Sequence, residues 1–389
     1  MARLGDICTF QSGGTPNRTN YSYFGGSIPW ITTVALNGGN IDSRDAVEWI
    51  TDKAIQESAA KIVPQNSIMI GTRVGIGKVA INSVPMSTSQ DIVSLLNIDA
   101  QSWDKKFICN FILAKNNFLL SQARGATIKG IKIETLANLQ IPDVSIDEQR
   151  HITVVLDKVS DLIAKRRQQL DKLDELVKSR FIEMFGEPEQ NPFGWQIKKL
   201  AAVVSSITAG WSANGETRPR EAGEKAVLKV SAVTQGLFKP DEYKVIPTDV
   251  QIKKYIYPKK GDLLFSRANT RELVGATAII EEDYPDLLLP DKLWKVIFTS
   301  EMDVYYAKHI LSTQAIRNVF SSQSTGTSGS MYNVSVEKFR ETLIPVPPIM
   351  LQREFANFVR RVDKPKLAIQ KSLEKLEMLK KALMQEYFG

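Results

Sequence analysis

Cysteine and histidine are scarce in this 389-residue chain, which contains two of each. Cys8 and Cys109 are too few for a disulfide framework, and neither has a cysteine or histidine neighbour at metal-ligand spacing. The sequence places no cysteine or serine partner for His151 or His309, so we expect both histidines to be surface or core residues. These absences argue against thiol chemistry, histidine catalysis and a bound metal.

Long apolar runs and a strong charge imbalance are also missing. No run approaches the ~20 apolar residues that a membrane-spanning helix needs, and the N-terminal residues lack the apolar core of a signal peptide. The net charge is +7, with much of the excess in residues 347–389, which hold nine basic and five acidic side chains. This charge is compatible with a polyanionic partner without requiring one. We expect a cytoplasmic protein with no membrane partner.

Two glycine-containing segments approach nucleotide-binding motifs without completing them. Residues 75–80 have the spacing of a dinucleotide fingerprint, and residues 72–78 nearly have that of a phosphate-binding loop. Both motifs need a following helix, whereas this segment leads to Pro85. The sequence Asn-Pro-Phe at 191–193 lacks the second proline of the base-clamping motif of amino-methyltransferases. We therefore expect no cofactor and no active site.

What the sequence does contain is a repeat. Residues 136–186 and 339–389 align without a gap at an offset of 203, with 14 identities in 51 positions. The matches include Gln149 with Gln352 and Phe185 with Phe388. In both copies, apolar residues recur every three or four residues, which predicts two long helices. At a rise of ~1.5 Å per residue, each helix is about 55–60 Å long.

A narrow apolar seam with charged flanks favours an intramolecular antiparallel pairing of these two helices. The alternative is that each helix packs only on its own domain. Pro365 should kink or restart the second helix, because proline removes an internal hydrogen bond. The residues expected in the seam are Leu170, Leu173, Leu176, Leu373, Leu376 and Leu379.

The blocks ahead of the two helices also repeat, more faintly. Residues 62–73 parallel residues 256–267: in both, an apolar strand runs into a hydroxyl residue, an arginine and a glycine-containing turn. A helix is expected next, at about 104–122 and 304–322, followed by a small-polar stretch. This order predicts an α+β fold with pseudo-two-fold symmetry, in which two mostly-β domains with small helices are separated by an intramolecular antiparallel coiled coil. The predicted domains are 1–143 and 187–346, and the predicted spacer helices are 144–186 and 347–389.

Short motifs accompany this layout: Leu-Gly-Asp-Ile at residues 4–7, strands ending in Thr-Arg or Ser-Arg, the Ile-Pro and Gln-Arg entry to each helix, and Phe-Gly at each helix end. In this order and duplication they resemble the specificity subunit of type I restriction-modification systems. The resemblance covers essentially the whole chain. It implies two target-recognition domains that each read one half of a split double-stranded DNA sequence. It also implies spacer helices that dock two modification (methyltransferase) subunits in a complex with restriction subunits, so that the chain itself is not an enzyme.

The repeat itself also suits a target in two parts. The helix length limits the separation of the two domains to a few tens of Å, hence roughly one to one and a half turns of B-DNA at ~34 Å per turn. Because the two blocks differ in sequence, we expect an asymmetric bipartite target. The alternative function is a non-catalytic coiled-coil scaffold that joins proteins, with no salt-dependent affinity for duplex DNA.

Arg73 and Arg267 end apolar strands, where a guanidinium can bridge guanine or pair with phosphate. The alternative for both is a structural ion pair with a carboxylate. Hydroxyl residues beside them are expected to donate to phosphate or to cap the strands, and Gln90 has the right chemistry for adenine. The remaining predicted DNA contacts are Thr72, Ser266, Lys78, Thr127, Lys129, Asn269, Arg271, Thr327 and Ser330.

Overall fold

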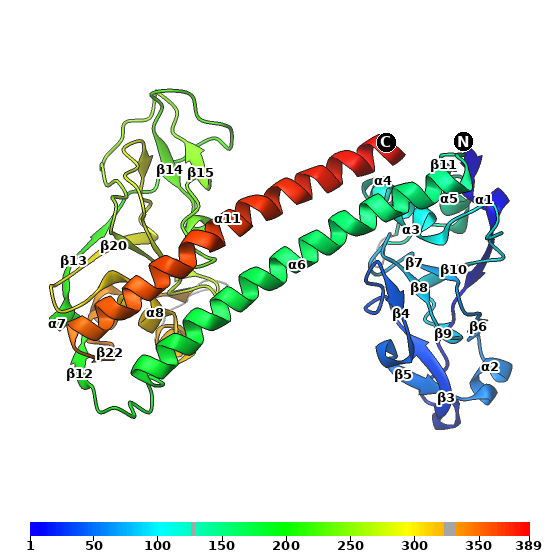
Figure 1. Ribbon diagram of the computed structural model, residues 1–389, viewed down its shortest axis with the longest axis horizontal. Coiled ribbons are helices and arrows are strands. Elements are labelled where there is room, and N and C mark those ends of the chain that lie inside the picture. Colours follow the sequence, from blue (N-terminus) through cyan, green and yellow to red (C-terminus); the bar gives the residue numbers. More distant parts are fainter. Residues whose placement is uncertain (126–128, 323–331) are drawn as a thin grey trace. The chain divides into compact units, whose positions relative to one another are not determined.

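The computed structural model describes residues 1–125, 129–322 and 332–389, which form two compact units. Unit 1 comprises Met1–Gln168 with Gln370–Gly389, and unit 2 comprises Gln169–Ile369. The two longest helices, α6 (Ile146–Phe185) and α11 (Ile349–Phe388), therefore contribute to both units (Figure 1). The division into two target-recognition domains and two spacers stays a prediction from the sequence repeat.

Unit 1 contains two main sheets. The first has the order β2-β10-β7-β8-β4 and the second the order β5-β3-β9-β6. The strands of the first are β2 (Thr9–Ser12), β10 (Ile92–Leu96), β7 (Ile68–Gly71), β8 (Val79–Asn82) and β4 (Asn40–Ile41). Those of the second are β5 (Glu48–Ile50), β3 (Phe24–Ile31), β9 (Met86–Thr88) and β6 (Ile62–Val63). The other elements are β1 (Ala2–Arg3), which pairs with β11 (Gln140–Ile141), and helices α1 (Leu4–Ile7), α2 (Asp52–Glu57), α3 (Lys105–Ala114), α4 (Asn116–Ser121) and α5 (Ile133–Ala137).

Unit 2 repeats this plan. Its larger sheet has the order β13-β20-β16-β18, and its second sheet has the order β15-β14-β19. These strands are β13 (Val204–Ala209), β20 (Leu293–Phe298), β16 (Leu263–Ser266), β18 (Thr277–Ile279), β15 (Tyr243–Val245), β14 (Ala226–Leu228) and β19 (Leu287–Leu288). Two further pairs are β12 (Gln196–Lys199) with β22 (Leu343–Val346), and β17 (Ala268–Asn269) with β21 (Tyr332–Asn333). The helices are α7 (Leu200–Val203), α8 (Val304–Ser312), α9 (Gln314–Ser322) and α10 (Val336–Glu341).

The two units share strand pairing as well as strand order. β10 pairs antiparallel with β2 and β7, and β20 pairs antiparallel with β13 and β16. The parallel pairing of β3 with β9 recurs between β14 and β19. The predicted α+β fold with an internal pseudo-two-fold repeat is therefore confirmed.

Each helix predicted after the sheets is in fact two helices. α3 and α4 are separated at Lys115, and α8 and α9 are separated at Thr313. The starts agree with the prediction, because the carboxylates of Asp104 and Asp303 accept backbone N–H groups of the first turn at 2.8 Å. Among the described residues, no helix combines the length and apolar character needed to cross a membrane.

The C-terminal ends of the long helices complete the cores. In unit 1, Phe388 is 2% exposed and lies 5.1 Å from Phe107 between ring centroids. In unit 2, Phe185 is 2% exposed and lies 4.8 Å from Tyr306 and 5.6 Å from Phe355. Each phenylalanine belongs to one sequence repeat and packs into the core formed by the other.

Ion pairs show that α6 and α11 run antiparallel. Arg167 donates to Glu377 at 2.6 Å in unit 1, whereas in unit 2 Lys366 pairs with Asp174 and Arg180 donates to Glu354 at 3.2 Å. Residue numbers rise along α6 as those of its partners fall along α11 (Figure 1). The predicted intramolecular antiparallel coiled coil is thus present.

α11 continues through Pro365 without a break, so the expectation that proline restarts the helix is wrong. Because proline has no N–H, the carbonyl of Arg361, four residues earlier, lacks its helical donor. Both residues are exposed, so water can hydrogen-bond to that carbonyl.

Two of the predicted seam residues lie outside the seam. Leu176 and Leu379 are 48% and 46% exposed, and the prediction was wrong for this pair. In unit 2 the buried position is Val177, four residues after Leu173 rather than three. A helix with 3.6 residues per turn drifts relative to a regular heptad, which exposes the i+3 position here. The half-buried members are Leu170, Leu173, Leu373 and Leu376.

Candidate nucleic-acid interface

A junction at the end of β7 holds three segments of unit 1 together. Thr72, which follows the strand, donates its backbone N–H to the carbonyl of Asp91 at 2.8 Å. Its own carbonyl accepts the N–H of Ile131 at 2.8 Å. The loop between β9 and β10 and the segment before α5 are therefore fixed against the end of β7.

Unit 2 repeats this junction at the end of β16. The backbone N–H of Arg267 donates to the carbonyl of Lys292 at 3.0 Å, and the N–H of Val334 donates to the carbonyl of Arg267 at 2.8 Å. The same two hydrogen bonds thus tie the loop before β20 and the segment before α10 to the strand. The backbone repeats here, whereas the side chains differ.

The strand ladders correct the alignment of these two strand ends. The first residue of β10 pairs with Gly71, and the first residue of β20 pairs with Ser266, so Gly71 and Ser266 correspond. Arg267 therefore corresponds to Thr72. The sequence alignment had predicted that it corresponds to Arg73. The alignment matched arginine with arginine, whereas the ladder hydrogen bonds fix the register directly and shift the match by one residue.

Burial corrects the prediction that Thr72 and Ser266 donate to phosphate. Thr72 is 4% exposed, and its hydroxyl donates to the carbonyl of Asp91 at 3.2 Å. Ser266 is fully buried, and its hydroxyl accepts from the side-chain amide of Asn269 at 3.5 Å. Both hydroxyls therefore cap the ends of their strands, which is the alternative that the sequence left open for them.

The other predicted contacts of unit 1 reach the surface. Arg73, Lys78, Gln90 and Lys129 are exposed, and they come from the junction segments or the turn that follows β7. Arg124 is also exposed, and its backbone forms a bridge with Gly130. The predicted contacts did not include Arg124, although its positive charge is a signal in the sequence. Thr127, and in the second block Thr327 and Ser330, lie outside the described residues.

Two of the predicted DNA contacts of unit 2 form hydrogen bonds or ion pairs within the protein. The Nε of Arg267 donates to the carbonyl of Asp291 at 3.1 Å, and its Nη2 lies 4.0 Å from Oδ2 of the same residue. Asn269 accepts the N–H of Thr270 at 2.9 Å, whereas Arg271 is exposed. The structural ion pair considered as the alternative for Arg267 is therefore present.

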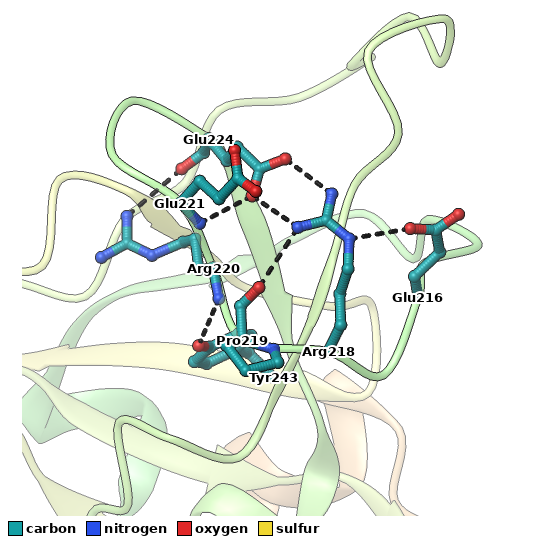
Figure 2. Close-up of polar contacts among 7 residues, drawn as sticks. All are labelled: Glu216, Arg218, Pro219, Arg220, Glu221, Glu224 and Tyr243. Carbon is teal, nitrogen blue, oxygen red and sulfur yellow. Dashed lines mark hydrogen bonds and ion pairs between the residues drawn. The ribbon is translucent and has the colours of Figure 1, made fainter.

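A second polar network fixes the loop that precedes β14 (Figure 2). Arg218 donates to the carboxylate of Glu224 at 2.6 and 2.8 Å and to that of Glu216 at 2.9 Å. Through these bonds, Arg218 lowers the pKa of Glu224 to about 2. The N–H of Arg220 donates to the hydroxyl of Tyr243 at 3.1 Å, which ties the loop to β15 (Figure 2). This network was not predicted, and its signal in the sequence is the mixture of acidic and basic residues at 216–225.

Both cysteines are buried, and one of the two histidines, His309, is half-buried. Burial raises the pKa of both Cys8 and Cys109 to about 12, so both thiols are protonated at neutral pH. Burial also lowers the pKa of His309 to about 3, while His151 is exposed on α6. Within the described part of the chain, no group of histidine, cysteine, aspartate and glutamate side chains is arranged to hold a metal ion.

Comparison with known proteins gives a match to a family described as the type I restriction modification DNA specificity domain, at residues 1–175 and again at 192–380. The chain belongs to this family. As a member of the specificity family, it carries the family's domain twice, in agreement with the two units.

Two curated relatives are specificity subunits of type I restriction enzymes. The MjaIX subunit of Methanocaldococcus jannaschii is 30% identical over 222 residues, which cover 52% of this chain and 51% of the relative. The EcoKI subunit of Escherichia coli K12 is 23% identical over 360 residues, which cover 86% of this chain and 75% of the relative. The match thus spans about half the length of the MjaIX subunit.

A solved structure shares the fold of this specificity-family chain. The S subunit of a type I restriction-modification system from M. genitalium aligns with a TM-score of 0.61 at 16% sequence identity, covering 100% of this chain and 95% of that chain. At this identity the likeness concerns the fold alone.

Proposed function

We propose that this specificity-family chain reads an asymmetric, bipartite sequence in double-stranded DNA, one half with each unit. The observation that carries the proposal is the junction at the ends of β7 and β16, which has the same backbone hydrogen bonds but different side chains. In DNA recognition, shared geometry sets position on the duplex, whereas side chains that reach base edges set the sequence. Two junctions with the same backbone geometry but different side chains suit two half-sites that differ in sequence.

The proposal includes partner subunits. Two modification subunits would dock on the paired helices, and restriction subunits would join that assembly. Support comes from apolar side chains that α6 and α11 leave exposed within the two units. Exposed apolar residues that gather on a surface are typical of protein interfaces. These exposed side chains include Leu162, Leu176, Leu367, Met378 and Leu379.

Methyl transfer and DNA cleavage are assigned to those partners, and the chain itself to recognition without catalysis or cofactor. The protonated thiols and the lowered pKa of the half-buried His309 support this division. The proposed site of action is the cytoplasm, where the DNA and the partner subunits are.

The experiment is methylation-site mapping in cells that carry this chain with its modification subunits. We expect one asymmetric motif in two parts with a fixed gap, and no such methylation when the chain is omitted. Exchanging the exposed junction residues of unit 1 should change one half of the motif only. A symmetric motif, or a motif that persists without the chain, contradicts the proposal. Duplex binding that is absent at every salt concentration favours the scaffold function instead.

A further inference from the structure

Four cations surround the strand end of unit 1 without carboxylate partners. Arg73, Lys78, Arg124 and Lys129 are all exposed, and none of them forms an ion pair within the described ranges 1–125, 129–322 and 332–389. We call these four residues the unit 1 cation cluster.

Backbone contacts bring the cluster into one region. Arg124 and Gly130 exchange two backbone hydrogen bonds of 2.9 Å, which places Arg124 beside Lys129. Gly130 in turn lies against Arg73, because a Cβ at Gly130 would be 3.1 Å from the Cγ of Arg73. The turn after β7 adds Lys78, whose N–H donates to Gly75 at 3.0 Å, and Gly75 forms a bridge with Arg73.

The arginine at the corresponding strand end of unit 2 has a carboxylate partner. Its guanidinium, Arg267, faces Asp291 at 4.0 Å. Asp291 is held in place because its carboxylate accepts from the hydroxyl of Ser212. By the strand register, the unit 1 residue at the position of Asp291 is Gln90, which carries no charge.

The loop that precedes β14 in unit 2 also pairs its arginines with carboxylates. Arg218 is paired with Glu216 and Glu224 (Figure 2), and Arg220 lies 3.0 Å from Asp286. Unit 2 therefore pairs Arg267, Arg218 and Arg220 with carboxylates, whereas unit 1 leaves all four cations of its cluster to solvent. Arg271, in the turn that follows Arg267, is exposed and forms no ion pair within the described ranges.

A free cation and a paired one differ in what they offer to DNA. Each phosphate neutralised by a free lysine or arginine releases a counterion, which lowers the slope of log K against log salt by about 0.9. A paired guanidinium must first give up its carboxylate, so its net gain is smaller. We infer that the unit 1 cation cluster is a phosphate-anchoring surface that supplies much of the salt-dependent affinity, and that the paired Arg267 at the equivalent end of unit 2 contributes little. This inference rests on the proposed function.

The test measures duplex affinity of the assembled complex, this chain with its modification subunits, against salt concentration. The probe is a labelled duplex that carries the mapped target. We expect Arg73→Gln and Lys129→Gln each to reduce the magnitude of the slope by about 0.9, and the fourfold glutamine variant of the cluster to reduce it by about 3 to 4. Lys61→Gln, at an exposed lysine of unit 1 next to β6, is the matched control and should leave the slope unchanged.

A second variant tests the paired Arg267 in the opposite direction. Asp291→Asn keeps an oxygen that can accept from Ser212 but removes the charge beside Arg267. We expect it to increase the slope by up to about 0.9, as a newly free cation should. Arg267→Gln should change the slope by less than half as much as Arg73→Gln.

The outcomes separate the inference from the function on which it rests. An unchanged slope in the fourfold variant, or an equal loss in Lys61→Gln, overturns the phosphate-anchoring surface while sequence-specific binding persists. Loss of assembly with the modification subunits instead of a slope change also overturns it, since the cluster would then contact protein. A wild-type complex with no sequence preference at any salt concentration rejects the proposed function itself.

Discussion

Gln149 and Gln352, 203 positions apart, make the same three hydrogen bonds. The side-chain oxygen of Gln149 accepts the N–H of Asp104 at 2.9 Å, and its amide donates to the carbonyls of Ser102 at 3.0 Å and Val144 at 2.9 Å. Gln352 is bonded in the same way, with the oxygen accepting at 2.9 Å and the amide donating at 3.0 and 2.7 Å to the carbonyls of Glu301 and Pro347. Each glutamine ties the start of a long helix to the segment that leads into α3 or α8.

Replacing either glutamine with methionine should destabilise the protein by about 3 kcal/mol or more. Methionine preserves the shape of the side chain but leaves one N–H and two carbonyls buried without partners, and each such group costs about 1–3 kcal/mol. Gln149 is 1% exposed and Gln352 is fully buried, so water cannot replace the amide. Urea denaturation of Gln149→Met and Gln352→Met measures the effect.

The matched control for this pair is Gln168→Met, an exposed glutamine on α6. Its denaturation midpoint should stay within the range of about ±0.5 kcal/mol that is usual for surface positions. Equal stability of all three variants would show that the buried amides do not hold the helices.

The glutamines and the long helices were readable from the sequence because the repeat is ungapped there. An identity at a fixed offset preserves both the side chain and its place on the helix, so Gln149 and Gln352 could be expected to tie the helices to the blocks. The alternation of globular and helical segments followed from apolar periodicity, which depends only on the chain itself.

The candidate site was only partly readable, because its chemistry depends on contacts between distant segments. In the sequence, Thr72 has the chemistry of a phosphate ligand. In the structure it is buried, and its hydroxyl donates to the carbonyl of Asp91 in the loop before β10. The pairing of Arg267 with Asp291 joins residues that no local pattern links. Leu176 fits a heptad as well as Val177 does, and only the packing of α6 on unit 2 decides between them.

Truncating the phenylalanine at either helix end should cost about 3–5 kcal/mol, the usual range for a buried Phe→Ala change. Phe388 packs on Phe107 and Phe111, and Phe185 packs on Tyr306 and Phe355. We expect Phe388→Ala and Phe185→Ala to lower the urea midpoint strongly, and Phe388→Leu to lower it less. The control is Phe118→Ala in unit 1, where the side chain is 49% exposed. A Phe388→Ala protein as stable as Phe118→Ala is incompatible with this packing.

Stability should fall on acidification between pH 7.5 and pH 5 because of His309. Burial, with Lys308 and Lys366 nearby, lowers its pKa from 6.5 to about 3 in the folded protein. The unfolded chain therefore binds a proton below pH 6.5 that the folded chain does not, and stability falls with pH in this window, by about 2 kcal/mol at pH 5. Asp363, on the neighbouring α11, has a raised pKa and acts in the opposite direction at lower pH.

The measurement is urea denaturation at pH 7.5 and pH 5 for the wild type and His309→Leu. Leucine has a similar volume and cannot be protonated, so the variant should lose less stability on acidification. His151→Leu, at the exposed histidine of α6, should retain the wild-type pH dependence. Identical pH dependence in the wild type and His309→Leu rules out this histidine as the cause.

The exposed leucines of the paired helices should matter for assembly and not for folding. Leu176 and Leu379 are 48% and 46% exposed, whereas Leu173 is half-buried against the core of unit 2. Leu176→Glu and Leu379→Glu should leave stability within about ±0.5 kcal/mol. If these side chains lie at the docking surface for modification subunits, a charge there should weaken assembly about tenfold or more, or about 1.4 kcal/mol.

Leu173→Glu should instead destabilise the chain alone, because it buries a carboxylate in the seam. Sedimentation of the chain with its modification subunits, alongside urea denaturation of the free chain, separates the two effects. Wild-type assembly by both exposed-leucine variants would place the docking surface elsewhere on the helices.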